Sequence, residues 1–271
     1  MLAESKELPS PENFSLTAIP EPHTRVTALD YHDVEIDFHS EFFNEPLVNC
    51  SDLNLVCHSY YFRKDGFNPP YYRSFSSALE NVYLRKTAAE KLVSVNETLE
   101  PLGLELCLID GYRPIQLQTE LWQHFLNRAR QILNNPAEHE CIAYAGHYCS
   151  NPDGFDEDNF RTWPVHTTGG AIDLLLRIRK SGEYLFQGSV FDDSDKISFT
   201  NYFEKFEPET TSDFEARKNR RILYWAMVRE GFINYPCEWW HFDLGTQLWA
   251  LNHPVKNTKA FYGYIAPPPE V

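Results

Sequence analysis

The spacing of apolar residues, together with helix-starting and helix-ending residues, predicts three helices. In the first, apolar residues recur at helical spacing among good helix formers until Pro101 and Gly103. Pro114 suits the first turn of the second helix. The run Thr211-Ser212-Asp213 offers a cap for the third helix, which Gly231 closes. The predicted helices span residues 84–99, 114–133 and 214–230.

Short apolar runs predict the strands. Val34, Ile36 and Phe38 alternate with polar neighbours, which favours a strand within residues 26–43. Apolar runs predict three more strands, at residues 104–109, at 171–178 and within 232–244. Because helices and strands interleave and the late connections are short, we expect an α+β fold, with helices flanking an antiparallel sheet.

Segments rich in polar residues, Pro and Gly separate these elements. Residues 1–24 are rich in Pro, Glu and Ser and predict an N-terminal arm or tail. Loops are predicted at 54–72, 134–164 and 200–208, and a loop as long as the second is either functional or mobile. Since no repeat or mid-chain linker is visible, we expect residues 25–271 to form a single domain.

Composition narrows the class of protein. A net charge of -15 over 271 residues argues against a nucleic-acid partner, because a phosphate backbone calls for a basic face. No run of about 18 apolar residues occurs, so we expect no membrane span. Six cysteines form no C-x-x-C pair and no export signal is visible, which predicts reduced thiols and a cytoplasmic protein. The oligomeric state stays open.

The stretch Cys237-Glu238-Trp239-Trp240-His241-Phe242-Asp243 sets polar groups among large aromatic side chains. An unpaired buried polar group costs a few kcal/mol, so Glu238 and His241 require partners. In one interpretation this is a core strand in which the two satisfy each other. In the other, they belong to a functional site that residues elsewhere complete.

The stretch His166-Thr167-Thr168-Gly169-Gly170-Ala171-Ile172-Asp173 supplies such residues, and its glycines permit a tight turn before the predicted strand. Imidazole and carboxylate are ligands that Zn²⁺ accepts, and a catalytic site combines three protein ligands with an open position. His166, Asp173 and His241 would form this set. Glu238 would then remain free to take a proton from the attacking water.

The spacing of Glu238 and His241 poses a geometric difficulty. In a regular strand, residues three apart point to opposite faces, so these two side chains could not enter one cleft. We therefore expect a bulge or a bend within the motif.

Arg113 lies in Asp110-Gly111-Tyr112-Arg113-Pro114, directly after the predicted strand 104–109. One hypothesis makes its guanidinium a charge clamp on the oxyanion that forms when water attacks a carbonyl. The other makes it a structural salt-bridge partner of Asp110 or of the acidic loop. In isolation, the motif favours the structural interpretation.

In their order, these stretches resemble the zinc D-alanyl-D-alanine dipeptidases of the VanX type, metallopeptidases with a Hedgehog/D,D-peptidase-like fold. The shared patterns are Asp-x-Tyr-Arg-Pro, His-x-x-Gly-x-Ala-x-Asp and Glu-x-x-His. The segment Gly188-Ser189-Val190-Phe191-Asp192 also resembles a family segment, and the similarity covers about residues 84–244. Three motifs in the family's order are far more specific than any one of them.

The resemblance implies the hydrolysis of D-alanyl-D-alanine, or a similar small D,D-dipeptide, by metal-activated water. It implies one Zn²⁺ per chain, with the ligands His166, Asp173 and His241. Glu238 would be the general base and Arg113 would stabilise the transition state. Asp192 would bind the free ammonium group of the dipeptide.

The chain departs from the family in two places. The family usually has Ser two residues before the first metal-binding His, where this chain has Pro164. The loss of that hydroxyl leaves the recognition of D-alanyl-D-alanine in question without touching the metal ligands. The stretch 134–162 is also long for the family, so it could reshape the mouth of the pocket.

Two other functions compete with this one. A D,D- or L,D-carboxypeptidase acting on peptidoglycan stem peptides would share the fold, but the lack of a visible export signal disfavours it. A zinc-stabilised binding protein would close the fourth position with another ligand, whereas Glu238 is left free.

Several further residues carry weaker signals. Cys237 is expected to be a buried thiol, and the run Asp192-Asp193-x-Asp195 lacks the glycine and terminal Glu of a calcium loop. His124, His139 and His147 have no partner at ligand spacing and are expected on the surface or on helices.

Overall fold

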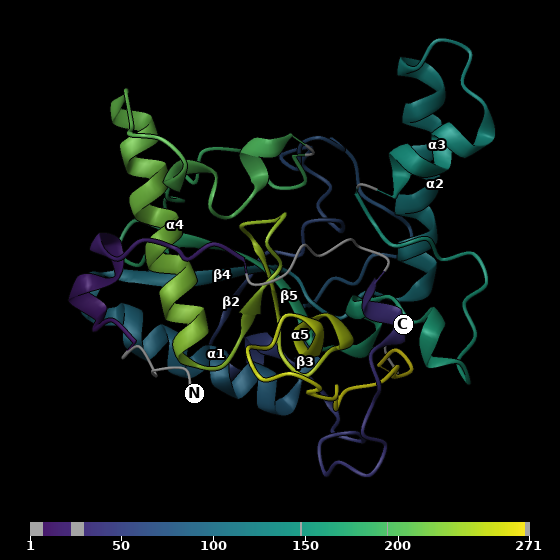
Figure 1. The fold of residues 1–271 in the computed structure, drawn as a ribbon, viewed down its shortest axis with the longest axis horizontal. Coiled ribbons are helices and arrows are strands. Elements are labelled where there is room, and N and C mark those ends of the chain that lie inside the picture. Colours follow the sequence, from purple (N-terminus) through teal and green to yellow (C-terminus); the bar gives the residue numbers. More distant parts are fainter. Residues whose placement is uncertain (1–7, 23–29, 147, 194, 269–271) are drawn as a thin grey trace.

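The computed structural model describes residues 8–22, 30–146, 148–193 and 195–268 (Figure 1). Its centre is a five-stranded sheet in the order β2-β4-β5-β7-β6. The pair β2–β4 is parallel and the other neighbouring pairs are antiparallel. These strands are β2 (Val56–Cys57), β4 (Leu104–Asp110), β5 (Ala171–Ile178), β6 (Ile233–Asn234) and β7 (His241–Asp243). A separate antiparallel pair joins β1 (Leu47–Asn49) to β3 (Tyr83–Arg85).

Helices flank this sheet, as the expected α+β class requires. Figure 1 shows α2 and α3 projecting together at the upper right, while α4 stands at the left and α1 runs below the sheet. The helices are α1 (Lys86–Leu99), α2 (Ile115–Ile132), α3 (Glu138–Ala145), α4 (Thr211–Arg229) and α5 (Gln247–Leu251). Short 3-10 helices are η1 (Pro11–Leu16), η2 (Asp30–Asp33), η3 (Cys50–Leu53), η4 (Glu100–Leu102), η5 (Phe160–Thr162), η6 (Val165–Thr168), η7 (Lys196–Ser198) and η8 (Tyr202–Glu204).

The three predicted helices are confirmed as α1, α2 and α4, and two of the predicted strands as β4 and β5. The cap of α4 lies one residue earlier than expected. Thr210 Oγ1 accepts a hydrogen bond from the backbone N–H of Asp213 at 3.1 Å, and the Asp213 carboxylate in turn accepts from the Thr210 N–H at 3.2 Å. This reciprocal pair is a capping box.

The strand predicted within residues 26–43 is wrong over the part that the structure describes, residues 30–43. Ile36 alone makes an isolated bridge, to Ala260, and the chain then turns at residues 37–44. The apolar alternation reflects packing of a loop instead, because Val34 is partly buried and Ile36 buried in one cluster while Phe38 is 48% exposed. A period of two predicts a strand only when a neighbour is available to pair with it.

The long loop predicted at 134–164 contains the helix α3. The Glu140 carboxylate accepts a hydrogen bond from the backbone N–H of Ala137 at 2.7 Å, which satisfies a free donor at the helix start. Cys141 and Ala145 are buried, and α3 packs against α2. This tertiary contact stabilises a helix that is too short to be stable alone.

The N-terminal segment lies against α4. Phe14 of η1 is fully buried, and the indole N–H of Trp225 donates to the Thr17 carbonyl at 2.9 Å. The expected arm therefore packs on the body of the molecule over residues 10–17. Its boundary at residue 24 falls outside the described residues and stays a prediction.

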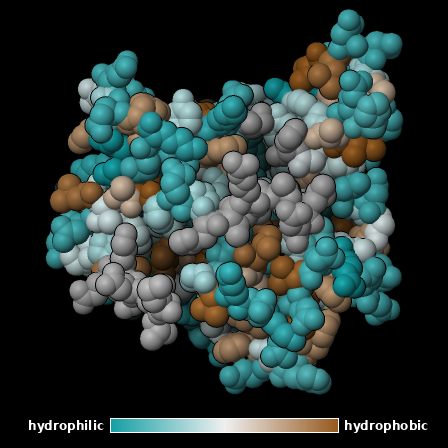
Figure 2. Space-filling model, viewed as in Figure 1, coloured by the Kyte–Doolittle hydropathy of each residue, from teal (hydrophilic) through white to brown (hydrophobic). Residues whose placement is uncertain are grey.

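Hydrophilic residues dominate the face seen in Figure 2, and hydrophobic residues appear there as separate small patches. The exposed large apolar side chains are indeed scattered along the described chain, from Leu8 near the N-terminus to Val255 near the C-terminus. Within the described residues, no helix is both long and apolar enough to cross a membrane.

Candidate active site

Three neighbouring strands place acidic and imidazole side chains next to one another. Asp173 of β5 pairs with Asp110 of β4 on one side and with His241 of β7 on the other. Directly opposed residues of a sheet project to the same face, so the three side chains gather at one place. All three are buried, which requires them to be paired or to bind a cation.

His166 reaches the same place from η6, which precedes β5. Gly169 ends η6 with a φ of +71°, and a Cβ at Gly170 would lie 2.5 Å from the Leu244 carbonyl oxygen. The two glycines therefore allow the tight turn into β5 that was predicted from the sequence. The backbone N–H of Arg113 donates to the His166 carbonyl at 3.1 Å, which ties η6 to the residues before α2.

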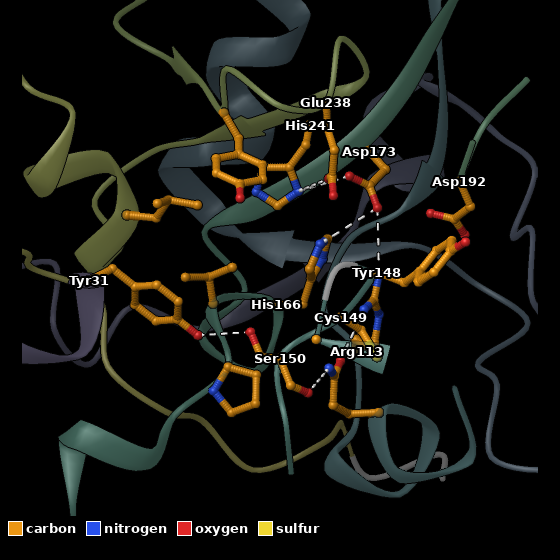
Figure 3. A pocket seen from close by; sticks show the side chains of 16 residues that line it. Tyr31, Arg113, Tyr148, Cys149, Ser150, His166, Asp173, Asp192, Glu238 and His241 are labelled. Carbon is orange, nitrogen blue, oxygen red and sulfur yellow. Dashed lines mark hydrogen bonds and ion pairs between the residues drawn. The ribbon is translucent and has the colours of Figure 1, made fainter. Parts of the chain in front are cut away.

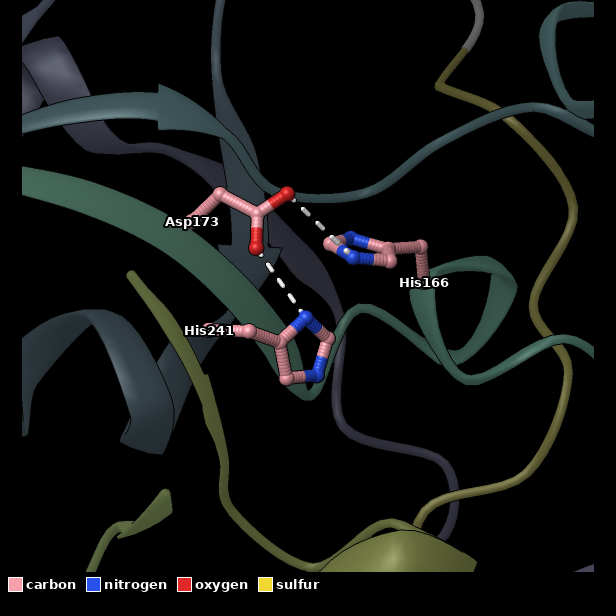
Figure 4. Close-up of side chains that lie close together, drawn as sticks. All are labelled: His166, Asp173 and His241. Atoms are coloured by element: carbon pink, nitrogen blue, oxygen red, sulfur yellow. Dashed lines mark hydrogen bonds and ion pairs between the residues drawn. The ribbon is translucent and has the colours of Figure 1, made fainter. Parts of the chain in front are cut away.

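The side chains of His166, Asp173 and His241 converge, as Figure 4 shows. One possible ligand atom from each lies within 4.8 Å of the other two. Asp173 faces His241 Nδ1 at 3.0 Å with one carboxylate oxygen and His166 Nε2 at 3.5 Å with the other. Ligands about 2.0–2.2 Å from a tetrahedral zinc ion are separated by about 3.3–3.6 Å, so the cluster fits a small cation.

Neighbours hold the outer nitrogen of each imidazole. His166 Nδ1 lies 2.8 Å from the Gly111 carbonyl oxygen, which can only accept, so Nδ1 carries the hydrogen and Nε2 keeps its lone pair. His241 Nε2 lies 2.9 Å from Asp243, whose other oxygen accepts from the Thr246 hydroxyl at 2.7 Å. His241 Nδ1 faces the cluster, where it can give its lone pair to a metal ion in place of a proton.

The electrostatics of the two imidazoles differ. Burial, with Arg113 and His241 nearby, lowers the pKa of His166 well below its ordinary value, so this imidazole is neutral. Burial alone would also lower the pKa of His241, but Asp243 and Asp173 outweigh it and raise that pKa well above its ordinary value. The cluster thus attracts positive charge, and a metal cation would take the place of the proton.

A turn between β6 and β7 resolves the spacing problem of the Glu-x-x-His motif. The Glu238 N–H donates to the Tyr235 carbonyl at 3.0 Å, and the His241 N–H to the Glu238 carbonyl at 3.3 Å. The Asn234 side chain donates to the carbonyls of both Glu238 and His241 at 3.0 Å. The expected bend is confirmed, and it brings Glu238 Oε2 within 3.8 Å of His241 Nδ1.

Glu238 is the most open of these acidic groups, with 23% of its side chain exposed, against 3% for Asp173 and 9% for Asp110. Burial raises the pKa of Glu238 to about 8, and the nearby carboxylates of Asp173 and Asp192 add to this effect. A carboxyl group that titrates near neutral pH can both accept and release a proton during a reaction.

Arg113 makes the structural ion pair that one interpretation expected, and its guanidinium also faces the cluster. Its guanidinium forms a buried ion pair with Asp110 at 2.6 Å and lies 3.6 Å from Asp173. A second nitrogen donates to Gln118 Oε1 at 2.9 Å, and the group lies 5.2 Å from the centroid of the Tyr61 ring. The salt bridge therefore orients the fork toward the cluster rather than away from it.

Asp192 lies in the loop after β5, in the left-handed region with a φ of +58°. One carboxylate oxygen accepts hydrogen bonds from Tyr71 at 2.7 Å and from Tyr61 at 3.0 Å. Burial raises the pKa of Asp192 to about 7, and Asp173 adds to the rise. The loop is thus built to hold an acidic group at the wall of the site.

All six residues singled out in the sequence line one pocket, shown in Figure 3. These residues are Arg113, His166, Asp173, Asp192, Glu238 and His241. The pocket continues past Asp192 and Glu238 into a larger cavity of about 610 Å³. Pro164 lies in the pocket wall, where it offers no hydroxyl group.

Sequence reasoning missed the residues that hold these groups in place. Asp243 was recoverable, because residues two apart in a strand share a face and Asp243 follows His241 by two. Tyr61 and Tyr71 fall in a predicted loop without any motif, and Asn234 and Gln118 carry no spacing signal.

The remaining candidates lie apart from the cluster. His124 packs among aromatic rings on α2, His139 is on α3, and His147 lies outside the described residues. Cys237 is partly buried, and burial raises the pKa of its thiol. Asp192 is engaged by the two tyrosine hydroxyls, not by a calcium loop.

Comparison with known proteins agrees with this geometry. The family model of the M15 peptidases, described as D-Ala-D-Ala dipeptidase, matches residues 73–260. A D-alanyl-D-alanine dipeptidase of Synechocystis is 32% identical over 181 residues, which cover 62% of this chain and 71% of the relative. The Enterococcus faecium enzyme of that name is 32% identical over 174 residues (62% and 77%), and the Escherichia coli one 30% over 158 (58% and 63%). The chain thus spans less than two thirds of the E. coli relative.

Proposed function

The chain belongs to the M15 family of D-Ala-D-Ala dipeptidases, which makes it a metallopeptidase of the Hedgehog/D,D-peptidase-like fold, and from this premise we propose that it uses Zn²⁺ to hydrolyse D-alanyl-D-alanine or a similar small D,D-dipeptide. The observation that carries the proposal is the cluster of His166, Asp173 and His241 beside a Glu238 that is not part of it. Three ligands with a neighbouring free carboxyl are the composition of a catalytic zinc site.

In this proposal the metal ligands are His166 Nε2, the Asp173 carboxylate and His241 Nδ1. When bound, Zn²⁺ supplies a Lewis acid that lowers the pKa of water and polarises the scissile carbonyl. The donor set fits this ion because both imidazoles present a lone pair to the cluster and the third donor is a carboxylate. We propose one ion per chain.

Glu238 is proposed as the general base. It lies beside the ligand His241 and has a pKa raised to about 8, so it can take a proton from the attacking water and pass it to the departing amine. Its partial exposure gives the water a path to the carboxylate.

Arg113 is proposed to stabilise the oxyanion of the transition state. The Asp110 ion pair and Gln118 fix its guanidinium, which therefore need not reorganise when negative charge develops. Asp192 is proposed to bind the substrate's ammonium group, and Tyr61 and Tyr71 hold the carboxylate for this contact.

The competing function is a D,D- or L,D-carboxypeptidase that trims stem peptides. Its substrate would have an acylated nitrogen where a dipeptide has a free ammonium group. The partly buried Asp192 carboxylate at that end of the pocket favours the dipeptide, because a free ammonium group can form an ion pair with it and an acylated nitrogen cannot. The single domain over residues 25–271 and the cytoplasmic location stay predictions from the sequence.

The test combines metal content with a panel of dipeptides. We expect about one zinc per chain, cleavage of D-alanyl-D-alanine but not of L-alanyl-L-alanine, and loss of activity with a chelator. Glu238→Gln is expected to abolish turnover while metal content stays unchanged. Loss of the metal in this variant would make Glu238 a ligand, and cleavage of acylated D,D-peptides over free dipeptides would favour the carboxypeptidase.

A further inference from the structure

Two hydroxyl groups that the mechanism does not use face each other in the pocket wall. Ser150 Oγ lies 2.9 Å from the phenol oxygen of Tyr31, and both residues line the pocket. Tyr31 belongs to η2 and Ser150 to the chain after α3, so two distant segments meet here. One hydrogen bond between two hydroxyls uses only one of their two protons, which leaves the pair with an O–H group able to donate elsewhere.

The charges of the pocket indicate which end of a substrate fits this pair. Asp192 and Glu238 are acidic, and an anionic group would be repelled from their side of the site. Figure 3 shows Tyr31 and Ser150 pointing toward one another, with His166 lying between this pair and Asp192. We propose that the Tyr31–Ser150 hydroxyl pair is the subsite that binds the terminal carboxylate of the substrate.

Pro164 leaves part of the pocket wall without a hydrogen-bond donor. The proline lines the same pocket, and its ring cannot donate a hydrogen bond to a carboxylate. Ser150, from the chain after α3, brings a hydroxyl group into the wall that Pro164 leaves without one.

Gln118 holds this subsite in register with the oxyanion clamp. Its Nε2 donates to the Ser150 backbone carbonyl at 2.7 Å, and its Oε1 accepts from Arg113 at 2.9 Å. The Gln118 side chain is buried, and one amide thus fixes both the main chain at Ser150 and the guanidinium. Since the anchor is the Ser150 main chain, replacing only its side chain leaves this contact in place.

The inference rests on the proposed peptidase function and narrows its substrate class. With Asp192 at one end and the hydroxyl pair at the other, the pocket recognises peptides whose amino and carboxyl ends are both free. A peptide whose carboxylate is converted to an amide loses the charge-assisted hydrogen bond at Tyr31 and Ser150.

The experiment measures kcat and KM of the zinc-loaded enzyme for a free dipeptide and for its C-terminal amide. The dipeptide is the best-cleaved member of a panel of D,D, mixed and L,L pairs. Ser150→Ala is expected to raise KM for the free dipeptide about tenfold to hundredfold and to change KM for the amide less than about twofold. Ser150→Thr keeps a hydroxyl and should retain most of the affinity, and Tyr31→Phe should resemble Ser150→Ala.

Ser181→Ala, in an exposed turn after β5, is the matched control and should behave as the unmodified enzyme. Equal losses for the free dipeptide and its amide would make the pair a structural latch between the two segments and overturn the subsite. Unchanged KM for both would overturn it as well. The dipeptide panel separates the proposed D,D-dipeptidase function from the proposed carboxylate subsite. Cleavage of L,L pairs alone would refute the D,D-dipeptidase function, and the subsite would still be tested with an L,L pair. If the enzyme cleaves no dipeptide, both proposals are refuted.

Discussion

Arg113 makes a structural ion pair, and we propose that the same side chain also acts in catalysis. Its ion pair with Asp110 is buried, so removing the guanidinium leaves an uncompensated carboxylate in the core. The same ion pair aims the fork at the cluster, 3.6 Å from Asp173. A variant of Arg113 should therefore affect stability and catalysis through different neighbours.

Arg113→Ala is expected to lower kcat by about 10²–10³-fold, because the oxyanion loses its preorganised donors. The free energy of unfolding should fall by about 3–5 kcal/mol as Asp110 loses its partner. Steady-state kinetics, metal analysis and urea unfolding check these values, with zinc expected to stay near one per chain. Arg113→Lys keeps the charge but not the fork, so its kcat should fall while stability recovers. An unchanged kcat in both variants would return Arg113 to a structural role.

The raised pKa of Asp192 leads us to expect that KM for a dipeptide depends on pH. Burial raises its pKa to about 7, so the carboxylate form, which we propose binds the ammonium group, predominates only above that pH. The α-amino group of a peptide loses its proton above about pH 7.7–8.0. KM for a free dipeptide should therefore fall as the pH rises through about 7 and rise again above about 8.

The measurement is KM between pH 6 and 9 for the unmodified enzyme and for Asp192→Asn. The amide of the variant carries no charge, so the fall in KM near pH 7 should disappear while the overall KM increases. If the variant keeps the same KM profile, a group other than Asp192 binds the amine.

At the scale of elements, the turn between β6 and β7 places the side chains of Glu238 and His241 on the same side of the pocket. Asn234 donates to the carbonyls of Glu238 and His241 and accepts from the Thr200 hydroxyl at 2.6 Å. It does not line the pocket, and its side chain bonds to the Thr200 hydroxyl and to main-chain carbonyls of the turn, so we expect it to act by positioning the turn. Mutation of a residue that orients metal ligands commonly lowers metal affinity or activity by about 10–100-fold.

Asn234→Ala is expected to lower both zinc affinity and kcat by about 10–100-fold, because two turn carbonyls lose their donor. Competition with a chelator measures the affinity, and steady-state kinetics measure kcat. Asn127→Ala provides the control, since the Asn127 side chain accepts a hydrogen bond from Arg130 on the exposed face of α2, away from the turn. Unchanged zinc affinity and kcat would show that the turn holds its shape without Asn234.

At the scale of the whole molecule, the N-terminal segment contributes stability rather than chemistry. Phe14 is fully buried against the core, whereas Leu16 in the same short helix is 73% exposed. Neither residue lines the pocket. The segment completes the cover of α4, and the catalytic groups lie elsewhere.

Phe14→Ala is expected to reduce the free energy of unfolding by about 3–5 kcal/mol, because it opens a cavity in the core. Leu16→Ala removes a side chain that is mostly in water and should change stability by less than about 0.5 kcal/mol. Urea unfolding checks both values, and kcat/KM is expected to stay the same in each. A loss of activity in Phe14→Ala at a temperature where it remains folded would place the segment in the function of the site.

The sequence by itself determined the long elements and the reactive groups. Local helical spacing and stop signals suffice for α1, α2 and α4, because these act within a few residues of each other. The three motifs contained five of the six pocket residues, and the segment 188–192 contained the sixth, Asp192. The His and Asp residues among them are types that a zinc site accepts as ligands. The need for a bend between Glu238 and His241 also followed from strand geometry alone.

Only the tertiary structure decided the rest. The failed strand at Val34–Phe38 and the unforeseen helix α3 depend on which neighbour each segment meets, and no local pattern contains that information. The residues that orient the chemistry came from outside the motifs: Tyr61 and Tyr71 reach Asp192 across more than a hundred residues of chain. A hydrogen-bond partner so distant is chosen by the packing of the whole fold, because contacts of this kind leave no periodic trace in the sequence.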